Sequence, residues 1–240
     1  RKIASDGIIT LLAGDAEGKA GRRGDGGDAT SSRLHTPTSV GGDTNGNIFI
    51  ASFNERKIRR VDGSSGIISS FAGTGIAGSD GDGNSATSAQ LNGPYGVFVD
   101  SAGSVYITER TNNKVRKVDG ATQLITTVAG RTDNSAGDAG IDGPATLAQL
   151  NSPYQSWVDE EGNVYIVDAM NRKVKGVSVF SGHIVTVAGD GSRAYAGDGD
   201  FASASSIIAP RAVWGLNGGD IFIADSQACN IRRLTVNPIP

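Results

Sequence analysis

An internal repeat of about 58 residues constrains the fold of this chain more than any other feature of its sequence. An Ala-Gly pair ends a run of β-forming residues in every repeat. The glycines of these pairs are Gly14, Gly73, Gly130 and Gly189. A proline series keeps the same spacing, at Pro37, Pro94, Pro153 and Pro210. We therefore divide the 240 residues into four repeats, at about 7–65, 66–122, 123–181 and 182–240.

Each repeat carries four strand-like segments with turn residues between them. In the second repeat these segments are Gly96–Asp100, Ser104–Glu109, Lys114–Asp119 and Leu124–Gly130. Apolar and polar residues alternate along the third segment, as in a strand with one buried face. Glycine and asparagine supply the positive φ angles that the turns need, and glycine is abundant, at 35 residues. Four short antiparallel strands per repeat predict an all-β fold, a β-propeller of four-stranded blades.

The repeat resembles a known family. The stretch NGPYGVFVDSAGSVYITERTNNKVRKVDG, followed by ITTVAG, is similar to the long, teneurin-like NHL repeats of extracellular and cell-surface proteins. The Asn-His-Leu triplet itself is replaced by Asn112-Asn113-Lys114 in the second repeat and by Asn171-Arg172-Lys173 in the third. The resemblance implies a propeller fold and an extracellular or cell-surface location. It implies no particular function, because one fold hosts many functions.

The strand pattern leaves both ends of the chain incomplete. The last set of inner strands ends at Leu234 with no outer strand after it, whereas Ile8–Gly14 reads as an outer strand with no inner strands before it. The N-terminal strand therefore completes either the last blade of its own chain, as a four-bladed ring, or a blade of another copy or longer chain, head-to-tail. We favour the second alternative, because Arg1-Lys2-Ile3 resembles the end of a third strand cut from a longer array. The residues of this assembly strand are Ile8, Ile9, Leu11 and Leu12.

The connectors between outer and inner strands hold an acidic, glycine-rich motif. Clustered Asp oxygens on glycine turns are suited to calcium, and the candidate ligands are Asp80, Asp82, Asp198 and Asp200. No repeat has the spacing of an EF-hand loop. Asp also caps turns by accepting bonds from backbone N–H groups, and we favour this structural interpretation over calcium.

The inner strands carry the residues nearest the propeller axis. Phe98, Trp157 and Trp214 occupy one equivalent position, where the first repeat has Gly41. These aromatic rings either pack between blades, which we favour, or form a stacking surface for a sugar or peptide. The inner strands end at Asp43, Asp100, Asp159 and Leu216. A catalytic site needs different residues in different roles, so this near-identity indicates turn capping instead.

Charge and composition narrow the possible partners. The net charge of −3 weighs against a nucleic-acid surface, and no stretch approaches the roughly 18 apolar residues of a membrane span. Two histidines and one cysteine give no converging zinc ligands or nucleophile. Basic residues recur on the third strand, and we expect solvated ion pairs with the acids Glu109, Asp168 and Asp225 across the hairpin.

These observations favour a non-catalytic structural or protein-interaction propeller that assembles head-to-tail through its N-terminal strand. Its partners are then protein, either further copies of itself or the rest of a longer chain. The alternatives are a propeller that binds carbohydrate or another small ligand and, less favoured, a metal-dependent hydrolase or lyase. Apart from calcium, the sequence indicates no cofactor.

Overall fold

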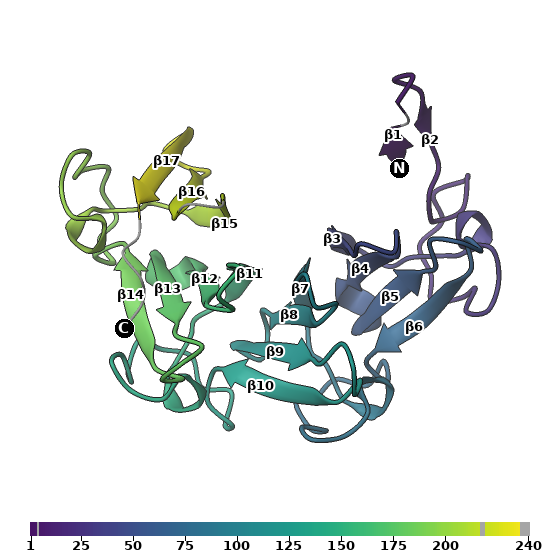
Figure 1. The fold of residues 1–240 in the computed structure, drawn as a ribbon, viewed down its shortest axis with the longest axis horizontal. Coiled ribbons are helices and arrows are strands. Elements are labelled where there is room, and N and C mark those ends of the chain that lie inside the picture. Colours follow the sequence, from purple (N-terminus) through teal and green to yellow (C-terminus); the bar gives the residue numbers. More distant parts are fainter. Residues whose placement is uncertain (4, 217–218, 236–240) are drawn as a thin grey trace.

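The fold is an all-β propeller, as the sequence predicts. A computed structural model describes residues 1–3, 5–216 and 219–235, so the end of the fourth predicted repeat, 236–240, lies outside the described residues. Figure 1 shows the blades side by side along an arc, with their inner strands on its concave side. Three blades have four antiparallel strands and the last has three. No helix in the described part of the chain is long and apolar enough to cross a membrane.

The strands follow one another from the inside of each blade to its outside. Blade I contains β3 (Pro37–Gly42), β4 (Ile48–Ser52), β5 (Lys57–Val61) and β6 (Ile68–Ala72). Blade II contains β7 (Pro94–Val99), β8 (Val105–Glu109), β9 (Lys114–Val118) and β10 (Ile125–Ala129). Blade III contains β11 (Pro153–Val158), β12 (Val164–Asp168), β13 (Lys173–Val177) and β14 (Ile184–Ala188). Blade IV contains β15 (Pro210–Gly215), β16 (Asp220–Asp225) and β17 (Asn230–Thr235).

Single turns of 3-10 helix lie at two places in the repeat. The connectors hold η1 (Ala29–Ser31), η3 (Ala86–Ser88), η4 (Ala145–Leu147) and η6 (Ala202–Ala204). The turns after the second strands of blades I and III hold η2 (Phe53–Glu55) and η5 (Ala169–Asn171). In the connectors to blades II and III, the helical turn is followed by the fully buried Leu91 and Leu150. These turns therefore anchor the connectors to the blades.

The hydrophobic core lies between blades and under the outer strands. Each outer strand of blades I to III begins with an isoleucine that has no exposed surface, namely Ile68, Ile125 and Ile184. Ile68 packs on Ala29 of the connector and on Ile50 and Val61 of the strands beside it. Burial of such a side chain contributes about 1.5–3 kcal/mol. The outer strand is thus held by apolar contacts as well as by its backbone.

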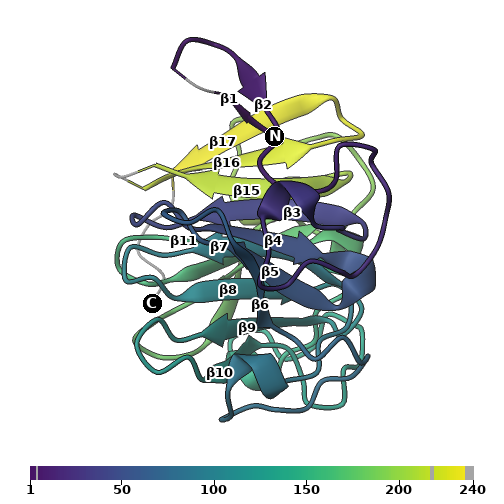
Figure 2. The same cartoon turned by 90° about the vertical axis from the view of Figure 1, so that its right-hand side faces the viewer.

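The N-terminus forms a small hairpin of β1 (Lys2–Ile3) and β2 (Ile9–Thr10). Ile3 faces Ile9 and Lys2 faces Thr10, which repeats the register of Val118 with Ile125 in blade II. The hairpin lies at one end of the arc in Figure 1 and β17 at the other (see also Figure 2). Within the described residues, β2 therefore pairs with β1, and the sheet of blade IV keeps three strands. The closed four-bladed ring is not the arrangement of this structure.

Candidate functional site

Blades I to III each contain a cation on the third strand that lies between two acids, whereas Arg232 of blade IV is ion-paired with Asp198 of its connector. In blade II, Arg116 contacts Asp82 of the connector at 2.6 Å and Glu109 at 3.6 Å. In blade III, Lys175 lies 2.8 Å from both Asp138 and Asp168. The expected pairing across the hairpin is thus confirmed for Glu109 and Asp168. The expectation that these pairs are solvated is wrong, because one member of each basic pair points into the blade, and Arg116 and Lys175 are completely buried.

Blade I keeps the same charge arrangement with the acid at another position. Its second strand ends at Ser52, and the carboxylate comes from Glu55, three residues later, where blades II and III have asparagine. Glu55 lies 3.0 Å from the buried Arg59, which also contacts Asp25 at 2.6 Å. A carboxylate thus lies beside the buried cation in all three of these blades, although its position in the repeat differs in blade I.

The buried acids also hold the connector in place. Glu109 accepts a hydrogen bond from the backbone N–H of Asn92, and Asp168 accepts one from Asn151. Burial raises the pKa of Glu109 to about 7, against the lowering effect of Arg116. Burial likewise raises the pKa of Asp168, although Lys175 favours its charged form. These titratable groups are therefore occupied in structural contacts within the blade.

Two of the four candidate calcium ligands are paired with a cation in this structure. Asp82 binds Arg116, and Asp198 lies 2.7 Å from Arg232. No group of three or more His, Cys, Asp or Glu side chains among the described residues has metal-binding geometry. Asp80 and Asp200 have no ion pair in the described structure. Calcium binding by these four residues stays an untested prediction.

The carboxylates at the ends of the inner strands cap turns. Asp43 accepts from the backbone N–H of Asn47 at 2.8 Å, and Asp100 accepts from that of Ser104 at 2.8 Å. Asp159 makes the equivalent bond to Asn163 at 2.7 Å. The turn-capping interpretation is confirmed for all three.

The three inner aromatic residues differ in their surroundings. Trp157 is 8% exposed, and its ring centroid lies 5.3 Å from that of Tyr165. The Trp157 ring packs so closely on Gly215 that no side chain would fit at position 215. Phe98 of blade II reaches Trp214 of blade IV, with ring centroids 6.1 Å apart. Trp214 itself is 55% exposed. Packing between blades accounts for Trp157, whereas ligand stacking at these rings stays a prediction.

Among the described residues, no strand pairs with the outer edge of β17, and a groove of about 670 Å³ runs along it. Its apolar walls include Ala202, Ile223 and Leu234. These three residues are the blade IV equivalents of Ala29, Ile50 and Val61, which surround Ile68 in blade I. The groove is therefore the place that the first isoleucine of an outer strand fills in the other blades. Sequence reasoning identified the missing strand but not the pocket that receives it.

The connector forms the other side of this position. In blade I, the N–H of Ile68 donates to the carbonyl of Gly27 at 3.0 Å, and the N–H of Gly26 donates to the carbonyl of Ile68 at 2.8 Å. Ile125 and Ile184 make the same two bonds to their own connectors. The acidic glycine motif is thus a backbone partner of the outer strand. In blade IV the equivalent residues, Gly199 and Asp200, line the groove.

Comparisons with known proteins support the fold. No family model matches the chain. A stretch of 93 residues, 38% of the chain, is 31% identical to Protein SUPPRESSOR OF QUENCHING 1, chloroplastic, of Arabidopsis thaliana, and covers 8% of that protein. The chain therefore spans only a small part of this relative, and the match covers too little of either protein to assign a family.

Solved structures resemble the chain over most of its length. An auxiliary nutrient binding protein from Bacteroides thetaiotaomicron matches with a TM-score of 0.63 at 18% identity, over 85% of this chain and 48% of that one. Another, from Bacteroides ovatus, has a TM-score of 0.62 at 17% identity over 84% and 48%. A catalytically inactive variant of virginiamycin B lyase from Staphylococcus aureus reaches 0.52 at 15% over 84% and 52%. The chain spans about half the length of these structures, and the likeness shows the fold alone.

Proposed function

We propose that this chain is a non-catalytic protein-interaction propeller that assembles by strand completion. In this proposal, segment 8–14 of one copy forms the outer strand of blade IV in the next. The observation that carries the proposal is the groove beside β17, whose walls repeat the surroundings of the buried outer-strand isoleucines. The resemblance to NHL repeats supports an extracellular or cell-surface setting for the assembly.

The N-terminal segment matches the strand that the groove lacks. Aligned on the Ala-Gly pair, Ile9 takes the place of Ile68, Ile125 and Ile184. Those three residues have no exposed surface, whereas Ile9 is 55% exposed in the hairpin. A two-stranded hairpin is marginally stable in water, so leaving β1 costs little, and burial of Ile9 would contribute about 1.5–3 kcal/mol.

Backbone and side-chain groups beside the groove support pairing with the same N-terminal strand of a second copy. The backbones of Gly199 and Asp200 correspond to those that bind Ile68 in blade I. In blade II, Asp82 accepts from the N–H of Thr127, the third residue of its outer strand. Asp198 and Leu11 are the equivalent pair in the proposed contact. Backbone pairing with an open sheet edge is a common mode of protein recognition.

The likeness of the blades supports the non-catalytic part of this proposal. Their buried charges form one repeated arrangement, and these charges contact one another and the connector. Catalysis needs groups with different roles that converge on a substrate. The nutrient-binding proteins that share this fold are consistent with a binding role for the chain.

Size-exclusion chromatography with mass measurement over a range of protein concentrations tests the assembly. We expect the wild-type chain to form species larger than one copy as concentration rises. Ile9→Asp should remain a single copy, because completion would bury the new carboxylate without a partner. Ile76→Asp is the matched control, since Ile76 is 62% exposed in a connector remote from the groove.

Two outcomes would contradict the proposal. One is a wild-type chain that stays a single copy at all concentrations. The other is equal assembly of the wild type and Ile9→Asp, which would place the contact elsewhere. Ile231→Asp on β17 provides an acceptor-side check, because Ile231 is 65% exposed and lines the groove.

A further inference from the structure

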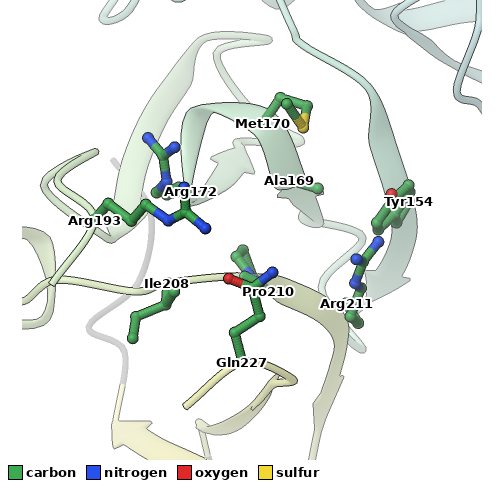
Figure 3. A pocket seen from close by; sticks show the side chains of 10 residues that line it. Tyr154, Ala169, Met170, Arg172, Arg193, Ile208, Pro210, Arg211 and Gln227 are labelled. Carbon is green, nitrogen blue, oxygen red and sulfur yellow. The ribbon is translucent and has the colours of Figure 1, made fainter. Parts of the chain in front are cut away.

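Three arginines surround a cavity of about 170 Å³ between blades III and IV. Arg172 follows the turn after β12, Arg193 lies in the connector, and Arg211 is the second residue of β15. Figure 3 shows Arg193 and Arg211 on opposite sides of the cavity. Met170 and Gln227 also face each other across it. The cavity is separate from the groove beside β17, with which it shares no lining residue.

The cavity exists because one side chain is missing at this boundary. At the boundary between blades I and II, the ring of Phe53 fills the equivalent space and lies 3.0 Å from where a Cβ on Gly93 would be. At the next boundary, the guanidinium of Arg110 covers the stacked rings of Tyr95 and Tyr154, 5.8 and 5.0 Å from their centroids. The equivalent residue of blade III is Ala169. The boundary between blades III and IV therefore differs from the other two, because its small alanine side chain leaves the space unfilled.

The charge around the cavity is positive and uncompensated. None of the ten lining residues is acidic. Within the described residues, Arg172, Arg193 and Arg211 have no carboxylate at ion-pair distance, although other arginines of the chain do. Three guanidinium groups around one small space repel one another, and an anion between them would relieve that repulsion.

Two of these arginines are held in place. The guanidinium of Arg211 lies 4.5 Å from the ring centroid of Tyr154, and its Nε donates to Ser226 at 3.3 Å. Arg172 donates one N–H to the carbonyl of Gly191 at 3.2 Å. Each group keeps further N–H donors free, and the planar fork of a guanidinium matches a carboxylate or a phosphate. The donors are thus partly fixed before a ligand arrives.

We propose that this cavity, the arginine pocket, binds the carboxylate or phosphate group of a small anionic ligand. Its volume suits one such group with a short carbon chain, and it is smaller than the cavities that enclose drug-sized ligands. Met170 and Ile208 provide apolar walls for the carbon part of the ligand. The pocket does not depend on strand completion, because its lining comes from blades III and IV of one chain.

Isothermal titration calorimetry with sodium phosphate and, separately, sodium succinate tests the proposal. Each titration is compared with sodium chloride at equal ionic strength. We expect saturable binding of at least one of the two anions, and the stronger of them identifies the phosphate or the carboxylate as the preferred group. Chloride should give no saturable heat.

Three variants locate the binding. Arg193→Gln and Arg211→Gln should each weaken binding by about tenfold or more, since a charge-assisted hydrogen bond contributes about 1.5–3 kcal/mol. Ala169→Phe should abolish it, because the ring found at Phe53 then fills the pocket while the net charge stays the same. Arg131→Gln is the matched control: Arg131 is ion-paired with Asp133 in another connector, and its loss should leave affinity unchanged.

The proposal is overturned if neither anion binds saturably to the folded wild-type chain. It is also overturned if Ala169→Phe, with an unchanged circular dichroism spectrum, binds as tightly as the wild type. A result in which Arg131→Gln weakens binding as much as Arg193→Gln would indicate general charge attraction, and would likewise reject a defined pocket.

Discussion

Blades III and IV have nearly the same sequence pattern and very different burial. On the third strand, Val174 of blade III has no exposed surface, whereas its equivalent in blade IV, Ile231, is 65% exposed. On the inner strand, Trp157 is 8% exposed and Trp214 is 55% exposed. The sequence of a repeat therefore determines where its own strands form. The faces of these strands become buried only when a neighbouring blade and an outer strand pack against them. The following predictions use the Ile9→Asp chain as reference, so that protomer concentration does not affect stability.

The largest difference should appear at the buried cations. Lys175→Met in blade III leaves Asp168, which has no exposed surface, without its cation, and should lower the free energy of unfolding by about 3–5 kcal/mol. Arg232→Met in blade IV should lower it by less than about 1 kcal/mol, because the partner Asp198 is 62% exposed. Urea unfolding measures both values. Equal losses would contradict the difference between the blades.

A smaller difference is expected at the apolar positions. Ile58 of blade I has no exposed surface, and Ile58→Ala should cost about 2–4 kcal/mol. The same substitution at its equivalent, Ile231→Ala, should change stability by less than about 0.5 kcal/mol. If strand completion occurs in the wild-type chain, Ile231→Ala should cost more there than in the Ile9→Asp reference, as thermal unfolding at high protein concentration would show.

The last prediction concerns how the stability of the chain depends on pH through Glu109 of blade II. The pKa of Glu109 is raised from its ordinary value of 4.5 to about 7, so between these values the folded chain binds a proton that the unfolded chain has released. The free energy of unfolding should therefore fall as pH rises through this window, by at most about 3 kcal/mol. Glu109→Gln removes this contribution, and its stability should change less with pH. Parallel curves for the two proteins would show that Glu109 titrates normally.

The sequence predicts the repeated architecture because each blade obeys local rules. The alternation of apolar and polar residues shows which side chains of a strand share a face, and glycine and aspartate mark the turns. Alternation also predicts correctly that the two members of a basic pair point to opposite faces of the strand. It does not show that Arg116 and Lys175 face the interior, because their burial depends on connectors that lie far away in the sequence. The backbone role of the acidic glycine motif was missed for this reason, since Gly27 and Ile68 meet only in the folded blade.

The arginine pocket was missed for a different reason. Sequence repeats draw attention to what recurs, and the pocket arises where one repeat lacks a side chain. Alignment of Phe53, Arg110 and Ala169 shows the gap once the structure identifies their shared position. The arginines around it are far apart in sequence, so no spacing rule groups them.

The contact between each connector and the next outer strand has a consequence for cleavage of the chain. Asp25 binds Ser70, 45 residues later, so blade I is fastened by a segment that precedes its first strand. A protease that cuts the exposed turn at Ser64 would leave both fragments attached through this crossing and through the sheet. Nicked protein should stay together in native buffer and separate only in denaturant. In blade IV the connector reaches only the third strand, through Asp198 and Arg232, and no outer strand follows within the described residues. We therefore expect unfolding of this blade to begin at β17.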